Sequence, residues 1–200
     1  MKIICIGRNY AEHAKELGKE IPEEPVIFMK PKSALLQPHT PFYYPEFTNE
    51  LHYECELVLR VCKNGKYIQE RNAGNYYNGI SVGIDFTARD VQKEAQEKGL
   101  PWEKAKAFDN SAAVGKFLDL TPDQKRANFT FKLLVNNEEV QRGNSADMLF
   151  KFDSIVAHIS NYFSLNIGDL IFTGTPAGVG ECVVGDELEA FLGNQSLLKL

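Results

Sequence analysis

The segment Leu51-His52-Tyr53-Glu54-Cys55-Glu56-Leu57 has the two-residue periodicity of a β-strand. Because successive side chains alternate across a strand, the apolar residues share one face, and His52, Glu54 and Glu56 share the other. Two carboxylates on one face repel each other, more strongly where solvent is excluded. Solvent, a shared proton or a bound cation can offset this repulsion. The segment alone does not decide among them, because strands with one wetted face are common.

A second strand with the same character follows at residues 79–86. Its even-numbered residues are apolar, and Asp85 points away from them, beside glycines that allow close backbone approach. Glu54, Glu56 and Asp85 therefore offer three strand-borne carboxylates. Hard oxygen ligands of this kind suit Mg²⁺ or Mn²⁺, and suit Ca²⁺ or zinc less well. With only three protein ligands, coordination positions stay open for water or substrate.

The rest of the chain predicts an α+β fold rich in strands, organised as a single domain over residues 1–200. There is no regular β-α-β alternation, so a doubly wound sheet is not expected. We expect the central strand at 51–61 to end in a hairpin turn at 63–66. We expect 103–109 to be irregular, with most of its lysines at the surface, and we expect Lys30 at the surface too. The other expected strands are 2–6, 26–29, 129–135, 138–142, 169–172, 188–192 and 196–200, and the expected helices are 10–17, 87–98 and 150–163.

Composition narrows the class of protein. The chain has 22 basic and 27 acidic residues, a net charge of −5, and no basic run, so nucleic acid is not an expected partner. No stretch approaches the roughly 20 apolar residues of a membrane span, so a membrane partner is not expected either. The four cysteines form no CxxC pair. We therefore expect reduced thiols in a cytoplasmic protein, and no cysteine zinc site.

Two further segments carry candidate chemistry. His13 and Glu16 are three residues apart on the first predicted helix, and so share a face. They are either incidental residues of an exposed helix or a pair that activates water. The glycine-rich segment 173–180 is either a tight turn or a loop whose amides hold a carboxylate. It lacks the Gly-Lys-Ser/Thr of a phosphate-binding loop.

Six blocks of the sequence together resemble the fumarylacetoacetate hydrolase family, and they follow the order that the family shows. They cover nearly the whole chain, which makes the combination specific although each block alone is weak. The blocks are Gly7-Arg8-Asn9-Tyr10, His13-x-x-Glu16, Tyr53-Glu54-Cys55-Glu56-Leu57, the segment 83–90, Pro101-Trp102 with 105–109, and the segment 173–180.

This resemblance implies a mixed β-sandwich roll, usually a homodimer, with a divalent cation held by Glu54, Glu56 and Asp85. It assigns Lys106 as the active-site lysine. It assigns His13 and Glu16 as the catalytic pair on a lid helix. Arg8, Gln92 and Thr175 match positions that line the substrate pocket.

The founding hydrolase of the family has an N-terminal domain with a fourth carboxylate ligand, and this sequence shows no counterpart. We therefore expect the short branch of the family, whose members act on small 2-oxo acids. The favoured reaction is hydrolysis of a C–C bond in an acylpyruvate, which releases pyruvate through an enolate stabilised by the cation and Lys106. Oxaloacetate decarboxylation and isomerisation or decarboxylation of 2-hydroxyhepta-2,4-diene-1,7-dioate are the alternatives.

Two other classes of function stay open. A non-catalytic module with a structural cation would need neither a lysine nor a base beside the carboxylates, yet the resemblance places both there. A glycosidase would use Glu54 and Glu56 as paired acids. Their position on one face of one strand is poorly suited to flanking a glycosidic bond.

Overall fold

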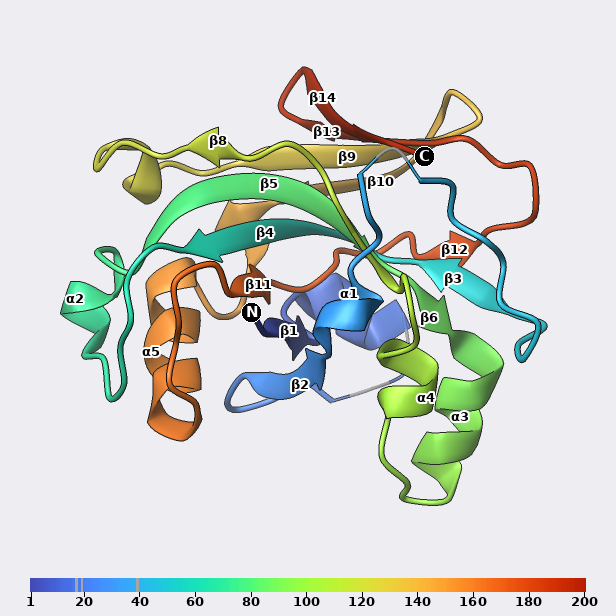
Figure 1. Ribbon diagram of the computed structural model, residues 1–200, viewed down its shortest axis with the longest axis horizontal. Helices are drawn as coiled ribbons and strands as arrows, with labels where there is room; N and C mark the ends of the chain where they lie inside the picture. Colours follow the sequence, from blue (N-terminus) through green and yellow to red (C-terminus); the bar gives the residue numbers. More distant parts are fainter. Residues whose placement is uncertain (17, 19, 39) are drawn as a thin grey trace.

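The computed structural model describes residues 1–16, 18, 20–38 and 40–200, and it confirms the strand-rich α+β class (Figure 1). The strands are β1 Ile3–Gly7, β2 Val26–Lys30, β3 Leu51–Tyr53, β4 Cys55–Val61, β5 Tyr77–Asp85, β6 Thr87–Ala88, β7 Ala112–Val114, β8 Leu118–Asp119, β9 Thr130–Val135, β10 Glu138–Asn144, β11 Leu170–Phe172, β12 Gly180–Glu181, β13 Leu188–Leu192 and β14 Gln195–Lys199. The helices are α1 Ala11–Glu16, α2 Glu70–Ala73, α3 Arg89–Glu97, α4 Glu103–Lys106 and α5 Phe152–Tyr162.

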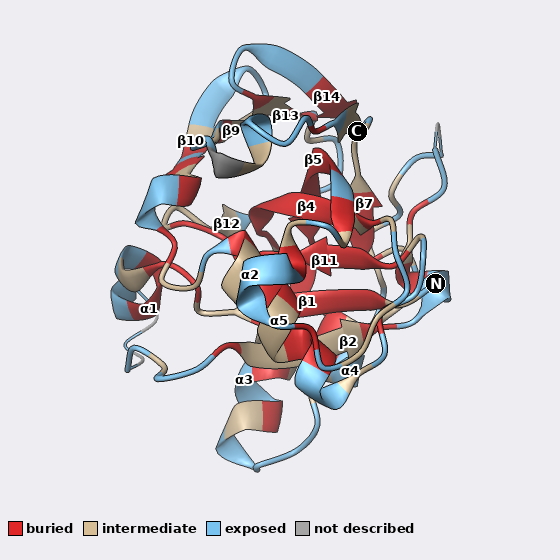
Figure 2. Ribbon diagram, turned by 90° about the vertical axis from the view of Figure 1, so that its left-hand side faces the viewer, coloured by how far each residue is buried: buried red, intermediate tan, exposed pale blue. Residues whose placement is uncertain are grey.

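Two larger sheets lie face to face. The first has the order β2-β1-β11-β4-β5-β7, with β8 also paired to β5, and the second has the order β10-β9-β13-β14. The second sheet covers β4 and β5, which curve beneath it in Figure 1, because β13 and β14 contact β5 and β9 contacts β4. Figure 2 shows β1, β11 and β4 buried across the centre of the molecule.

The central strand is interrupted at Glu54, where we had expected it to run unbroken from 51 to 61. β3 pairs with β6 and β12 in a small third sheet, whereas β4 pairs with β5 and β11 in the first sheet. The chain therefore changes sheets at Glu54, whose carbonyl accepts the N–H of Asp85 at 2.9 Å. This junction places the ends of several strands, and the acidic residues they carry, at one point.

The faces predicted for the two acidic strands are confirmed by the core. Leu57 and Leu59 belong to the large hydrophobic cluster between the sheets, together with Val82 and Ile84. Val58 lies on the opposite face, in a second cluster with Ile3, Cys5 and Phe172. Glu54, Glu56 and Asp85 alternate with the residues of the main core and therefore point to that opposite face.

Several local expectations were wrong. Residues 63–66 do not form a hairpin turn, because Gly65 pairs with Leu165 and the link from β4 to β5 contains α2. The segment 103–109, expected to be irregular, begins with helix α4. Lys30 is buried, although it was expected at the surface, and Lys106 is buried as well, unlike most lysines expected in its segment.

The helices lie outside the two larger sheets. α5 packs with α2 at one end of the first sheet, and α3 and α4 form a projecting pair at the other end (Figure 1). The first helix begins at Ala11, but its expected end at Leu17 lies outside the described residues. None of the described helices combines the length and apolar character that a membrane crossing requires.

Candidate active site

A cavity of about 540 Å³ opens where β1, α1, α3 and α4 meet the junction at Glu54. Seven of the nine site residues expected from sequence line it. The remaining two, Asp85 and Glu16, lie directly behind lining residues and contact them. The lining residues from the expected set are Arg8, His13, Glu54, Glu56, Gln92, Lys106 and Thr175.

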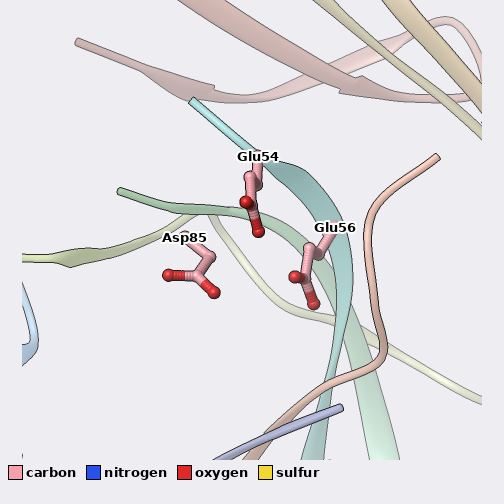
Figure 3. A group of neighbouring side chains, drawn as sticks. All are labelled: Glu54, Glu56 and Asp85. Carbon is pink, nitrogen blue, oxygen red and sulfur yellow. The ribbon is translucent and has the colours of Figure 1, made fainter. Parts of the chain in front are cut away.

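Three carboxylates, two in the cavity lining and one behind it, point toward one another (Figure 3). Glu54, Glu56 and Asp85 each offer an oxygen, and these three atoms lie within 4.8 Å of one another. The residues are only 6%, 2% and 0% exposed. Solvent therefore cannot offset their repulsion, which was the first of the three alternatives raised by the strand pattern.

Cationic side chains compensate two of the three carboxylates. The Lys106 Nζ lies 2.7 Å from Glu54 Oε2 and 2.9 Å from Asp85 Oδ2. Arg89 Nη2 reaches the other oxygen of Glu54 at 2.6 Å, and Lys30 Nζ reaches Asp85 Oδ1 at 2.7 Å. These contacts form a network of five charges of alternating sign, four of them buried and Arg89 partly buried.

Neighbouring charges in this network stabilise each other's ionised forms. Burial is the largest single influence and acts to raise the pKa of the Glu54 carboxyl, but Lys106, Arg89 and smaller neighbouring contributions together outweigh it and hold that pKa well below its ordinary value. Burial acts to lower the pKa of Lys106, whereas Asp85 and Glu54 raise it above its ordinary value. Lys106 is therefore a stable ammonium group despite being buried.

Glu56 is not part of this charge network. The polar contact recorded for it among the described residues is the backbone N–H of Gly174, 2.6 Å from Oε2. Burial, followed by the charges of Asp85 and Glu54, raises the pKa of its carboxyl well above the ordinary value. A shared proton or a bound cation would relieve this strain.

The donor set fits a divalent cation. It consists of three hard carboxylate oxygens, as Mg²⁺ or Mn²⁺ requires. Asp85 Oδ1 also keeps a free lone pair, because no described residue donates it a well-aligned hydrogen bond although Lys30 lies 2.7 Å away. The hydrogen bonds of Lys30 Nζ run instead to the carbonyls of Lys106 and Ser111 and to the Ser111 hydroxyl.

His13 and Glu16 form the pair expected from their spacing. His13 Nδ1 lies 3.0 Å from Glu16 Oε2, and His13 is 4% exposed at the cavity wall. The other carboxylate oxygen of Glu16 accepts the N–H of Gly178 at 3.1 Å. The glycine-rich loop thus anchors α1 over the cavity. Its amides do hold carboxylates, as one of the two sequence interpretations anticipated.

Two cationic residues near the acids had no role in the sequence interpretation. Lys30 resembles a surface lysine in sequence. Arg89 lies inside the block 83–90, where its local sequence indicates only the first turn of a helix. Arg89 donates to Glu54 and to Gln92 Oε1, both at 2.6 Å, and so fixes a metal-ligand candidate and a pocket residue together. The position of Arg89 beside Gln92 on the first turn of α3 is the signal that could have identified it.

The remaining two pocket candidates differ in character. Arg8 adopts a left-handed backbone conformation with φ +57°, which a non-glycine residue holds only under constraint from its surroundings. The Thr175 hydroxyl donates to the carbonyl of Cys55 at 2.8 Å. Since its single hydrogen is committed to the protein, this hydroxyl can only accept a hydrogen bond from a ligand.

Comparison with known proteins places this site in a family. The family model described as "Fumarylacetoacetate (FAA) hydrolase C-terminal" matches residues 2–199. The chain belongs to the fumarylacetoacetate hydrolase family. The resemblance inferred from the six sequence blocks is therefore confirmed.

Relatives of this fumarylacetoacetate hydrolase family member carry out several reactions. An oxaloacetate tautomerase of Escherichia coli (strain K12) is 41% identical over 199 residues, covering 98% of this chain and 90% of that protein. The crystal structure of fumarylpyruvate hydrolase from Pseudomonas aeruginosa, in complex with Mn²⁺ and pyruvate, is 35% identical with a TM-score of 0.93, covering 100% and 88% of the two chains.

A more distant structure extends the range of reactions. It is the 2-hydroxyhepta-2,4-diene-1,7-dioate isomerase from Mycobacterium marinum, which is 31% identical with a TM-score of 0.84 and covers 99% of this chain and 72% of that one. The family therefore supports an enzyme that uses a metal, and it leaves the exact reaction open.

Proposed function

We propose that this enzyme acts on small 2-oxo acids through their enol forms, and that its main reaction is keto–enol tautomerisation of a 2-oxo dicarboxylate such as oxaloacetate. One observation carries the proposal. His13, oriented by Glu16, and the Lys106 ammonium line the same cavity as Glu54 and Glu56, with Asp85 directly behind. A base and a charge-stabilising group can therefore act on one bound substrate. The 41% identity to an oxaloacetate tautomerase supports this choice.

We assign Glu54, Glu56 and Asp85 to hold Mg²⁺ or Mn²⁺. When bound, such a cation supplies positive charge near the carboxylate and 2-oxo groups of the substrate. Lys106 adds a fixed donor where negative charge develops on the 2-oxo oxygen. Arg8 and Lys93 lie in the cavity lining and supply further positive charge, suitable for a second carboxylate of the substrate.

His13 is the proposed acid–base group. Its Nδ1 is hydrogen-bonded to Glu16, so Nε2 is the nitrogen that remains for the substrate. In the tautomerisation, this nitrogen removes a proton from the carbon beside the 2-oxo group, and a proton is returned at the enol oxygen. No bond between carbon atoms is broken, and no water is consumed. Glu16 orients the imidazole, and Gln92 and Thr175 contact the substrate from the cavity wall.

Hydrolysis of an acylpyruvate is the second candidate function, and it remains the prediction made from sequence. The same His13–Glu16 pair favours it, because a pair of this kind can activate a water molecule for attack on the distal carbonyl. The 35% identical fumarylpyruvate hydrolase supports it as well. The homodimer and the cytoplasmic location likewise remain predictions.

A substrate panel tests the proposal. Purified protein is incubated with Mg²⁺ or Mn²⁺ and either enol-oxaloacetate, acetylpyruvate or fumarylpyruvate. Loss of enol absorbance is followed beside pyruvate release. We expect fast loss of the oxaloacetate enol without matching pyruvate release. Fast pyruvate release from an acylpyruvate, with slow tautomerisation, would favour the second candidate instead. No metal-dependent activity on any substrate would contradict both.

A further inference from the structure

The buried amide of Gln141 contacts both parts of the site from the opposite sheet. Gln141 lies on β10, where the register with β9 shifts at Val140 in a β-bulge, and it is only 2% exposed. Bulges commonly redirect a side chain toward a functional site. Here the Gln141 side chain extends to the backbone of Cys55, the residue between Glu54 and Glu56, and to the glycine-rich loop.

Each polar atom of this amide has a partner. Its Oε1 accepts the Cys55 N–H at 2.9 Å. Its Nε2 donates to Thr175 Oγ1 at 2.9 Å and to the carbonyl of Pro176 at 3.1 Å. Thr175 in turn donates its hydroxyl to the Cys55 carbonyl. Both backbone groups of Cys55 are thus held by side chains at the point where the central strand changes sheets, and where ladder partners are lost.

The loop held by Gln141 also holds two functional carboxylates. Gly174 donates its N–H to Glu56, and Gly178 donates its N–H to Glu16. Gly178 has φ +95°, and a side chain there would lie 2.6 Å from the carbonyl of Val140. The loop therefore packs directly against the bulge that carries Gln141, which leaves it little freedom to move independently.

We infer that Gln141 is a positioning residue that couples the Glu54–Glu56 ligand strand to the loop anchoring the His13–Glu16 helix. Gln141 does not line the cavity, so it acts through other residues and not on the substrate. Its Oε1 holds the 54–56 segment through the Cys55 N–H, and its Nε2 holds the glycine-rich loop through Thr175 and Pro176. The inference rests on the proposed function, because it assumes that Glu54 and Glu56 hold the cation.

The test uses Gln141→Met, which keeps approximate volume but removes both sets of hydrogen bonds. The dissociation constant of Mn²⁺ is measured by calorimetry without substrate, so catalysis does not enter the readout. We expect it to rise about 10- to 100-fold, the usual effect of removing a group that orients metal ligands. In hydrogen exchange, peptides covering 173–180 should exchange faster than in the wild type.

Ser160→Ala is the matched control. The Ser160 hydroxyl accepts a buried backbone N–H, that of Ile68 at 2.7 Å, on helix α5 and outside the cavity lining. Its loss should lower stability in a similar way while leaving Mn²⁺ binding and the exchange of 173–180 unchanged. An equal change of Mn²⁺ affinity in this control would overturn the inference.

Thr175→Val provides a second variant if Gln141→Met folds poorly. It removes the hydroxyl between Gln141 and Cys55, and it should also weaken Mn²⁺ binding. The double variant should bind Mn²⁺ only slightly less tightly than whichever single variant binds it less tightly, because both substitutions disrupt the same hydrogen-bond network. Fully additive effects, or Mn²⁺ binding within twofold of wild type in Gln141→Met, would contradict the positioning role of Gln141 but would leave the proposed metal site intact. Failure of the wild type to bind Mn²⁺ would instead contradict the metal site.

Discussion

Lys30 and Asp85 form an ion pair with no solvent exposure of either side chain, with 2.7 Å between Nζ and Oδ1. Lys30 also donates to the carbonyl of Lys106, so one ammonium group holds a candidate metal ligand and the end of α4 that carries Lys106. Buried pairs of this kind are strongly destabilising when a single partner is lost.

Lys30→Met should therefore destabilise the fold by roughly 3–5 kcal/mol, because it leaves a buried carboxylate short of a counter-charge. Urea unfolding measures this difference. Lys32→Met, two residues away at an exposed position, is the control and should change stability by less than about 0.5 kcal/mol. Equal unfolding midpoints for both variants would contradict the structural role of Lys30.

The stability of the metal-free protein should fall as the pH rises above the ordinary glutamate range. Burial and two neighbouring carboxylates raise the pKa of Glu56 in the folded state, so folding binds a proton there that the unfolded chain releases. This contribution is complete below the unfolded pKa, about 4.3, and is lost as the pH passes through the raised value. Glu54 has a lowered pKa, and its contribution is lost only below the ordinary value.

Glu56→Gln removes the ionisable group and should flatten this slope in chelator. Thermal unfolding between pH 4 and pH 8 measures it, and Mn²⁺ should flatten the wild-type slope as well, since a bound cation favours the ionised form. A slope that persists unchanged in Glu56→Gln would assign the effect to another group.

Tyr10→Phe should leave stability unchanged or raise it. Tyr10 is 3% exposed, and its hydroxyl has no hydrogen-bond partner among the described residues. Removing an unsatisfied buried hydroxyl removes a desolvation cost. Tyr77→Phe is the matched control, because that hydroxyl donates to Asp153 Oδ1 at 2.9 Å, and its loss should cost about 1.5–3 kcal/mol. A loss of similar size in Tyr10→Phe would reveal a partner, such as an ordered water.

His13→Ala should lower tautomerisation and acylpyruvate hydrolysis by roughly 10²–10⁴-fold, the usual contribution of general acid–base catalysis. Glu16→Gln should act in the same direction, because it weakens the hydrogen bond that orients His13. Oxaloacetate decarboxylation should fall far less, since departure of CO₂ requires no proton removal from carbon. The ratio of the three rates is the decisive measurement. An equal fall in all three would make the helix a lid or a substrate clamp only.

Lys106→Met should lower kcat for all three reactions by roughly 10²–10³-fold, because each reaction develops negative charge on the 2-oxo oxygen. Lys104→Met is the control, since that lysine is exposed on the same helix. Steady-state kinetics with each substrate measure the effect. An unchanged kcat in Lys106→Met would restrict this lysine to neutralising Glu54 and Asp85.

Local sequence determined the parts of the site that depend on periodicity. Alternation at 51–57 and 80–86 places Glu54, Glu56 and Asp85 on faces opposite the apolar core, because the period of a strand is a property of the backbone itself. The three-residue spacing of His13 and Glu16 likewise predicted their contact. The family resemblance carried the same residues, together with Lys106, into one site.

Tertiary structure alone decided which partners these residues meet. Lys30 comes from β2, Arg89 from α3 and Gln141 from β10, and each reaches the 54–56 segment or Asp85 across a large separation in sequence. From its local sequence, Lys30 is indistinguishable from a solvated lysine, because burial of a charge depends on carboxylates supplied by distant strands. The break at Glu54 has the same origin. Its neighbours pair with different sheets, and hydrogen-bond partners of a strand are chosen by the assembled fold rather than by the strand's own residues.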